Sequence, residues 1–282
     1  MESPMGQVEE GLALAHFMRL RVLSLSISLL LASLSGCIGD IGDGGLFGSD
    51  EEDELFGIPG GLTLACLQSS KFTNMMIEID YTEGYEPQSQ TLSTLKSRIE
   101  SVCDKPGGVT IKTTQTDFGH GDSWSADDVR EIGRDTRETQ PQDGSTLRWH
   151  LLFPNGSYES NGVLGVAVDA STAAIFLDDV RDAEGPFSRP SAAAIENAVT
   201  VHEVGHLLGL VNLVYTSPAA HEDSGHPGHS NNEDSVMYWA IDSGDFSSFF
   251  ENDVPDDFDS DDRDDLAAIA AGDLEVNEQL WS

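Results

Sequence analysis

The residues best suited to do chemistry together are His202, Glu203 and His206, within the segment His-Glu-Val-Gly-His. Residues four apart on an α-helix lie on one face, about 5 to 6 Å from each other, so two imidazoles can bind one metal ion. Zinc prefers tetrahedral coordination, and a catalytic site adds a third protein ligand and one position for water. Glu203 can take a proton from that water as general base. The spacing predicts one catalytic Zn²⁺ ion and hydrolysis by a zinc-activated water.

The helix that carries these residues is predicted to run from about Ser191 to Leu208, where Gly209 can end it. Two histidines and a glutamate can also coincide on the solvated face of a helix. The apolar residues Leu207, Leu208 and Leu210 instead indicate a buried helix, which suits an active site.

Two segments resemble one known family. Residues 202–209 match the HExxHxxG pattern of the metzincin zinc peptidases, and residues 235–238 resemble their Met-turn. The resemblance implies an α+β, metzincin-like zincin fold with a twisted mixed β-sheet, an active-site helix, a Met-turn and a C-terminal helix. It also implies that Met237 packs beneath the metal without binding it. A peptide or protein substrate would lie extended along an edge strand, expected within residues 163–176.

The third zinc ligand departs from the family's usual place. That position is Asn212, and an amide is a poor zinc ligand. Matrixin-like metzincins place a His-Ser pair eight residues before the methionine, and here His229 lies eight residues before Met237. The resemblance therefore implies His202, His206 and His229 as the metal ligands. His221, His226, Asn212 or a carboxylate remain as alternatives for the third.

The segment from His229 to Tyr238 also resembles the corresponding turn of archaemetzincins, where cysteines bind a second zinc. Ser230 and Ser235 stand at those positions, so a second zinc held by thiolates is not expected.

The elements around this motif follow from residue periodicity. The expected strands cover Met75–Tyr81, Val109–Thr114, Leu147–Phe153 and one or two segments within 163–176. The expected further helices are a segment around Leu92–Val102, one capped by Ser125, and a last helix from Ser260 with Leu266 and Ile269 facing inward.

The N-terminal region contains a targeting signal. Cationic residues at 18–21 precede an apolar run over residues 22–35, too short to span a bilayer comfortably, and the run leads into Leu-Ser-Gly-Cys37. This end resembles the lipobox of prokaryotic lipoproteins, in which the cysteine is lipidated. The resemblance implies a lipid anchor on Cys37 at the extracellular face of the cell membrane. An uncleaved anchor helix is the alternative.

These patterns divide the chain into three predicted regions. Residues 1–36 are an N-terminal extension and signal peptide, residues 37–61 an acidic, Gly-rich tether, and residues 62–282 the metzincin-like catalytic domain.

The chain is strongly acidic. Fourteen Lys and Arg residues against fifty Asp and Glu give a formal net charge of -36. Such a surface requires salt to screen its self-repulsion and predicts a halophilic protein of the haloarchaeal type. Nucleic acid is excluded as a partner because nothing basic is available to displace counterions from phosphates. The sequence indicates no oligomeric state.

Two cysteines remain after Cys37. Cys66 and Cys103 would form one disulfide in an oxidising exterior, and two unpaired buried thiols are the alternative.

The combined expectation is an extracellular, membrane-anchored zinc metalloendopeptidase. The alternative is a non-catalytic zinc-binding surface lipoprotein, and the mismatch at Asn212 is its best support.

Overall fold

The computed structural model describes residues 55–249 and 254–281. The predicted signal peptide, the lipobox and Cys37 lie outside these residues. Within them, no helix has the length and apolar character needed to cross a membrane.

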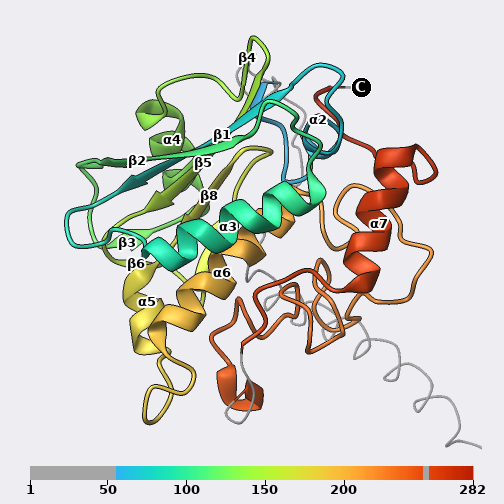
Figure 1. Ribbon diagram of the computed structural model, residues 1–282. Helices are drawn as coiled ribbons and strands as arrows, with labels where there is room; N and C mark the ends of the chain where they lie inside the picture. Colours follow the sequence, from blue (N-terminus) through green and yellow to red (C-terminus); the bar gives the residue numbers. More distant parts are fainter. Residues whose placement is uncertain (1–54, 250–253, 282) are drawn as a thin grey trace, which may run out of the picture. The chain divides into compact units, whose positions relative to one another are not determined.

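A mixed β-sheet forms the centre of the domain, with strand order β2-β1-β5-β8-β7 and β4 paired to β5 (Figure 1). Its strands are β1 (Asn74–Tyr81), β2 (Val109–Gln115), β4 (Gln142–Asp143), β5 (Thr146–Phe153), β7 (Gly165–Ala167) and β8 (Thr172–Ile175). β1 pairs in parallel with β2 and β5, and β5 with β8, whereas β7 and β4 run antiparallel to their neighbours. The sheet is mixed, as expected, but more parallel than the α+β class implies, because helices connect its main strands.

Helices cover both faces of this sheet. α3 (Ser89–Val102) and α6 (Ala192–Leu207) lie together on one face, and α4 (Ala126–Thr136) lies on the other (Figure 1). Ser125 caps α4, as predicted, and the structure adds a capping box, because the Ser125 hydroxyl accepts from the Asp128 backbone N–H at 3.1 Å while the Asp128 carboxylate accepts from the Ser125 N–H at 2.8 Å. The smaller elements are α2 (Thr63–Leu67), α5 (Leu177–Asp182), the 3₁₀ helix η1 (Phe246–Phe249) and the two-stranded pair β3 (Ser123–Trp124) and β6 (Ser157–Tyr158).

Because helices cover both faces of the sheet, strand residues that point to either face can be buried. On β1 the predicted apolar positions Met75, Ile77 and Ile79 are buried in the main core. Asp80, which follows Ile79, is also buried, and its carboxylate lies 3.0 Å from Nε2 of His150 on β5. Polar residues between the apolar ones therefore face the second layer rather than solvent.

The C-terminal third of the domain is mostly irregular and ends in α7 (Ser260–Ala271), whose Leu266 and Ile269 are buried as expected. α7 contacts α2 and α3. A disulfide joins Cys66 of α2 to Cys103, the residue after α3. It ties the start of the domain to the helix beside α6.

The described part of the predicted tether, residues 55–61, contacts the domain. Phe56 is buried, its backbone carbonyl accepts from the Ala170 N–H at 2.9 Å, and the Arg134 guanidinium lies 4.6 Å from its ring centroid. The end of the described chain returns to the same region, because the Leu280 N–H donates to the Gly61 carbonyl at 2.8 Å.

Candidate metal centre

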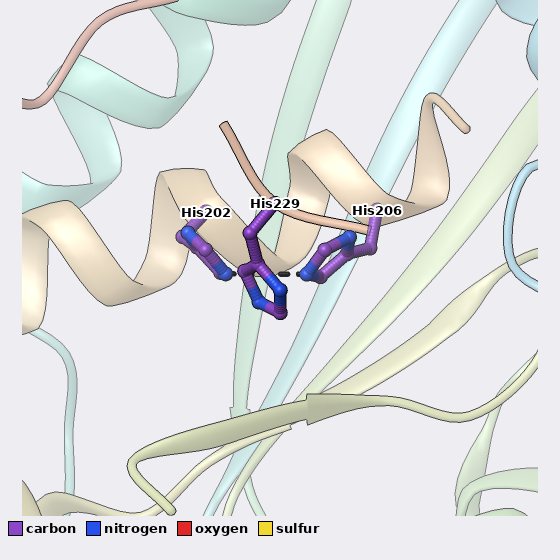
Figure 2. Close-up of side chains that lie close together, drawn as sticks. All are labelled: His202, His206 and His229. Atoms are coloured by element: carbon purple, nitrogen blue, oxygen red, sulfur yellow. Dashed lines mark hydrogen bonds between the residues drawn. The ribbon is translucent and has the colours of Figure 1, made fainter. Parts of the chain in front are cut away.

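The first two candidate ligands lie on the last turns of α6. This helix is buried on all sides from Ile195 to Leu207, because it runs between the sheet and the irregular C-terminal segment. His202 and His206 are fully buried, and their Nε2 atoms are 3.1 Å apart (Figure 2). Local helical spacing alone gives this approach, as the sequence predicts.

The end of α6 fixes the second histidine. Gly209 has φ +84°, a left-handed conformation that glycine adopts without steric cost. The turn brings the carbonyl of Leu210 back over the helix, where it lies 2.7 Å from Nδ1 of His206.

The third histidine comes from a loop far along the chain. The ring centroid of His229 lies 5.2 Å from those of both His202 and His206, and the ligand atoms of the three residues lie within 4.8 Å of one another (Figure 2). Backbone hydrogen bonds hold its segment on two sides. The Asp223 N–H donates to the His229 carbonyl at 2.8 Å, and the Ser230 N–H donates to the Met237 carbonyl at 2.8 Å.

Each imidazole is oriented through its Nδ1. These atoms lie 2.7, 2.7 and 3.2 Å from the backbone carbonyls of Val236, Leu210 and Pro227, for His202, His206 and His229 in turn. A carbonyl can only accept a hydrogen bond, so each Nδ1 carries the hydrogen and each neutral ring has its lone pair on Nε2. Nε2 of His229 is buried and has no hydrogen-bond partner among residues 55–249 and 254–281.

The surroundings keep these rings neutral. Burial lowers the pKa of His206 to about 3 and that of His229 to about 4. It also lowers the pKa of His202 well below its ordinary value, with a further contribution from the two neighbouring histidines. No proton therefore lies between the Nε2 atoms of His202 and His206 at neutral pH, and two lone pairs face each other across 3.1 Å.

A divalent metal ion fits this arrangement. Two tetrahedral zinc ligands at about 2.0 to 2.1 Å from the metal are roughly 3.3 Å apart, close to the 3.1 Å found here. The buried Nε2 of His229 supplies a third donor without a partner in the described chain. Three neutral imidazoles are a donor set typical of zinc.

Glu203, the predicted general base, is fully buried on α6 next to the edge strand β7. A Cβ atom on Gly165 would lie only 2.5 Å from Oε1 of Glu203, so the glycine allows the carboxylate to lie against the strand. Gly165 was not among the predicted site residues. The available signal is a glycine within an apolar strand, which often marks a close approach.

Met237 packs against the same helix between the two histidines. It is fully buried, and a Cβ atom on Gly205 would lie 2.2 Å from its Sδ atom. The preceding Val236 supplies the carbonyl that orients His202. The segment that resembles a Met-turn therefore packs against α6 and orients one candidate ligand.

The alternatives for the third ligand make other contacts. The Asn212 side chain donates to Glu222 at 2.8 Å and accepts from the Ser217 N–H at 2.7 Å. His226 is stacked on Trp239, with ring centroids 4.2 Å apart. His221 lies beside α7, as described below. Of the candidate residues, His229 is the one that joins His202 and His206 in a three-residue group.

The fold and the site together define an α/β domain with a mostly parallel sheet and a buried three-histidine group that can hold a metal ion.

No protein-family model matches the sequence, and no curated protein matches it. Three solved structures resemble the fold. Archaemetzincin from Methanopyrus kandleri has 13% identity and a TM-score of 0.47, with 69% of this chain and 94% of that chain covered. Archaemetzincin from Archaeoglobus fulgidus, complexed with malonate, has 16% identity and a TM-score of 0.38, with 67% and 99% covered. Metalloproteinase-II from Bacteroides fragilis has 13% identity and a TM-score of 0.40, with 69% and 52% covered. Values this low establish neither a shared family nor a shared activity.

Proposed function

We propose that this protein is a zinc-dependent metalloendopeptidase in which His202, His206 and His229 hold one catalytic ion. The observation that carries the proposal is the convergence of three neutral, buried imidazoles, two of which direct Nε2 lone pairs at each other across 3.1 Å. That approach is repulsive in the absence of a cation. A bound zinc ion would supply a Lewis acid that polarises a peptide carbonyl and lowers the pKa of water toward about 7.

The protein's own residues supply the rest of the reaction. Glu203 accepts a proton from the attacking water and later donates it to the leaving amine. Burying a carboxylate costs free energy, which is expected where the group has a chemical role. The edge strand β7 lies beside Glu203, so an extended peptide can add along this edge through main-chain hydrogen bonds.

The alternative function is a non-catalytic zinc-binding surface lipoprotein. It needs the same three histidines but no carboxylate at position 203. The two proposals therefore differ in what a change of Glu203 does.

The test is a Glu203→Gln variant of the full chain in molar salt, assayed with an unfolded protein as substrate. We expect zinc content equal to that of the wild type and a loss of kcat of about 10²- to 10⁴-fold, the usual contribution of a general base. Glu131→Gln, an exposed position on α4, is the matched control and should keep full activity. Equal turnover by wild type and Glu203→Gln, or no chelator-sensitive cleavage by the wild type, would exclude the peptidase.

We also propose that the domain is held at the extracellular face of the membrane by a lipid on Cys37. The support is the sequence pattern alone, a short apolar run after cationic residues and ending in Leu-Ser-Gly-Cys37. Replacement of Cys37 by serine should release the protein from the membrane fraction.

A further inference from the structure

A second group of metal-ligating side chains lies at the start of α7, apart from the three-histidine site. One ring nitrogen of His221 and one carboxylate oxygen each of Asp259 and Asp261 lie within 4.8 Å of one another. His221 is only 2% exposed, whereas the two aspartates are partly exposed. An ion bound here would have one buried ligand and access from solvent.

The hydrogen bonds of His221 leave one ring nitrogen available. Its Nε2 lies 3.0 Å from Oδ2 of Asp265, and a carboxylate accepts, so Nε2 carries a hydrogen and Nδ1 is the ring atom that can bind a metal. Metal-binding histidines usually donate their other ring N–H to a carboxylate, a backbone carbonyl or water. Asp265 therefore prepares Nδ1 to act as a ligand.

Two buried atoms at this place have no hydrogen-bond partner in the described part of the chain. They are Nδ1 of His221 and Oδ1 of Asp262, which are 3.7 Å apart. This separation of 3.7 Å is too long for a hydrogen bond between the two atoms.

We propose that Nδ1 of His221, with Asp259 and Asp261, binds a second divalent transition-metal ion of the zinc type, and that Asp262 faces this ion. Imidazole together with carboxylates suits zinc better than calcium, which takes oxygen ligands. The partial positive charge at a helix N-terminus opposes a cation, but the full charges of several aspartates in one helical turn outweigh it. This ion is additional to the single catalytic zinc that the sequence predicts, and it needs no thiolate.

The second ion would stabilise the loop that delivers the third histidine. The Asn231 N–H donates to the His221 carbonyl at 2.8 Å, so the segment around His221 runs directly beside the segment of His229. The Ser235 hydroxyl donates to Asp262 at 2.6 Å, which connects the turn before Met237 to α7. A metal on His221 would therefore cross-link this loop to the helix.

The experiment measures zinc stoichiometry on the metal-free full chain in molar salt, by equilibrium dialysis against Zn²⁺ followed by metal analysis. We expect two equivalents in the wild type and one in Asp261→Asn. The structure records no hydrogen bond from the Asp261 side chain to a described residue, so this variant should fold. Asp264→Asn, an exposed position in the same turn, is the matched control and should bind two equivalents.

His221→Asn tests the buried ligand and should also bind one equivalent. One equivalent in the wild type, or two in Asp261→Asn, would overturn the proposal. An equal loss in Asp261→Asn and Asp264→Asn would do the same, since it would indicate general attraction to acidic surface. The equivalent retained by Asp261→Asn reports the three-histidine site, so failure of either site is seen separately.

Discussion

Zinc binding by the three-histidine site should change little between pH 7 and pH 5. A metal ligand must be neutral, and an ordinary imidazole with a pKa of about 6.5 is only about 3% neutral at pH 5. Two such ligands would weaken apparent zinc affinity by about 10³-fold. In the folded protein the pKa of His206 is about 3 and that of His229 about 4, which leaves both about 90% neutral or more at pH 5. The expected loss from these two residues is less than about twofold.

The measurement is a competition titration with a chelator whose own pH dependence has been calibrated. The metal-free protein is itself expected to be less stable at pH 5. The pKa of His229 is lower in the folded state than in the unfolded state, so the unfolded state binds a proton first as the pH falls. The free energy of unfolding is therefore full above about pH 6.5 and decreases by about 3 kcal/mol as the pH falls toward about 4. Circular dichroism must therefore show folded protein at each pH. A 10³-fold weakening of zinc binding by folded protein would refute the neutral, preformed site.

Two further predictions concern stability and the general base. Replacing both Cys66 and Cys103 by alanine should lower the free energy of unfolding by about 4 kcal/mol, given their separation of 37 residues, and an unchanged midpoint in urea would contradict this. Gly165→Ala would place a Cβ atom 2.5 Å from Oε1 of Glu203 and displace the carboxylate by about 1 Å, so kcat should fall about 10²-fold with zinc retained. Gly121→Ala is the control, because a Cβ atom there meets open space, and it should keep full activity. An equal loss of kcat in both variants would contradict the role given to Gly165.

Much of the fold is predictable because its elements carry local signals. The alternation of Met75, Ile77 and Ile79 predicts β1, and Ser125 as N-cap predicts the start of α4. The pairing of strands has no such local signal. Strand pairing depends on how the connecting segments pack, and the sheet is more parallel than the predicted α+β class implies.

The third metal ligand shows the same limit. The eight-residue spacing to Met237 favours His229 only through the resemblance to metzincins, because a loop of this length could otherwise bring Asn212, His221, His226 or a carboxylate near the helix. Pairing of the His229 segment with the Met237 segment decides among them. The Val236 carbonyl in turn contacts Nδ1 of His202, 34 residues away, and this tertiary contact brings the turn to the helix.

The sequence by itself determined that His202, Glu203 and His206 share the end of one helix, because four-residue spacing and a following Gly209 act within a few residues. Only the tertiary structure decided what surrounds them. Burial that holds the imidazoles neutral, the approach of Gly165 to Glu203, and the second group around His221 all need chain segments far apart in sequence to pack together. Local geometry is set by covalent spacing, whereas pKa, burial and convergence are properties of the packed molecule.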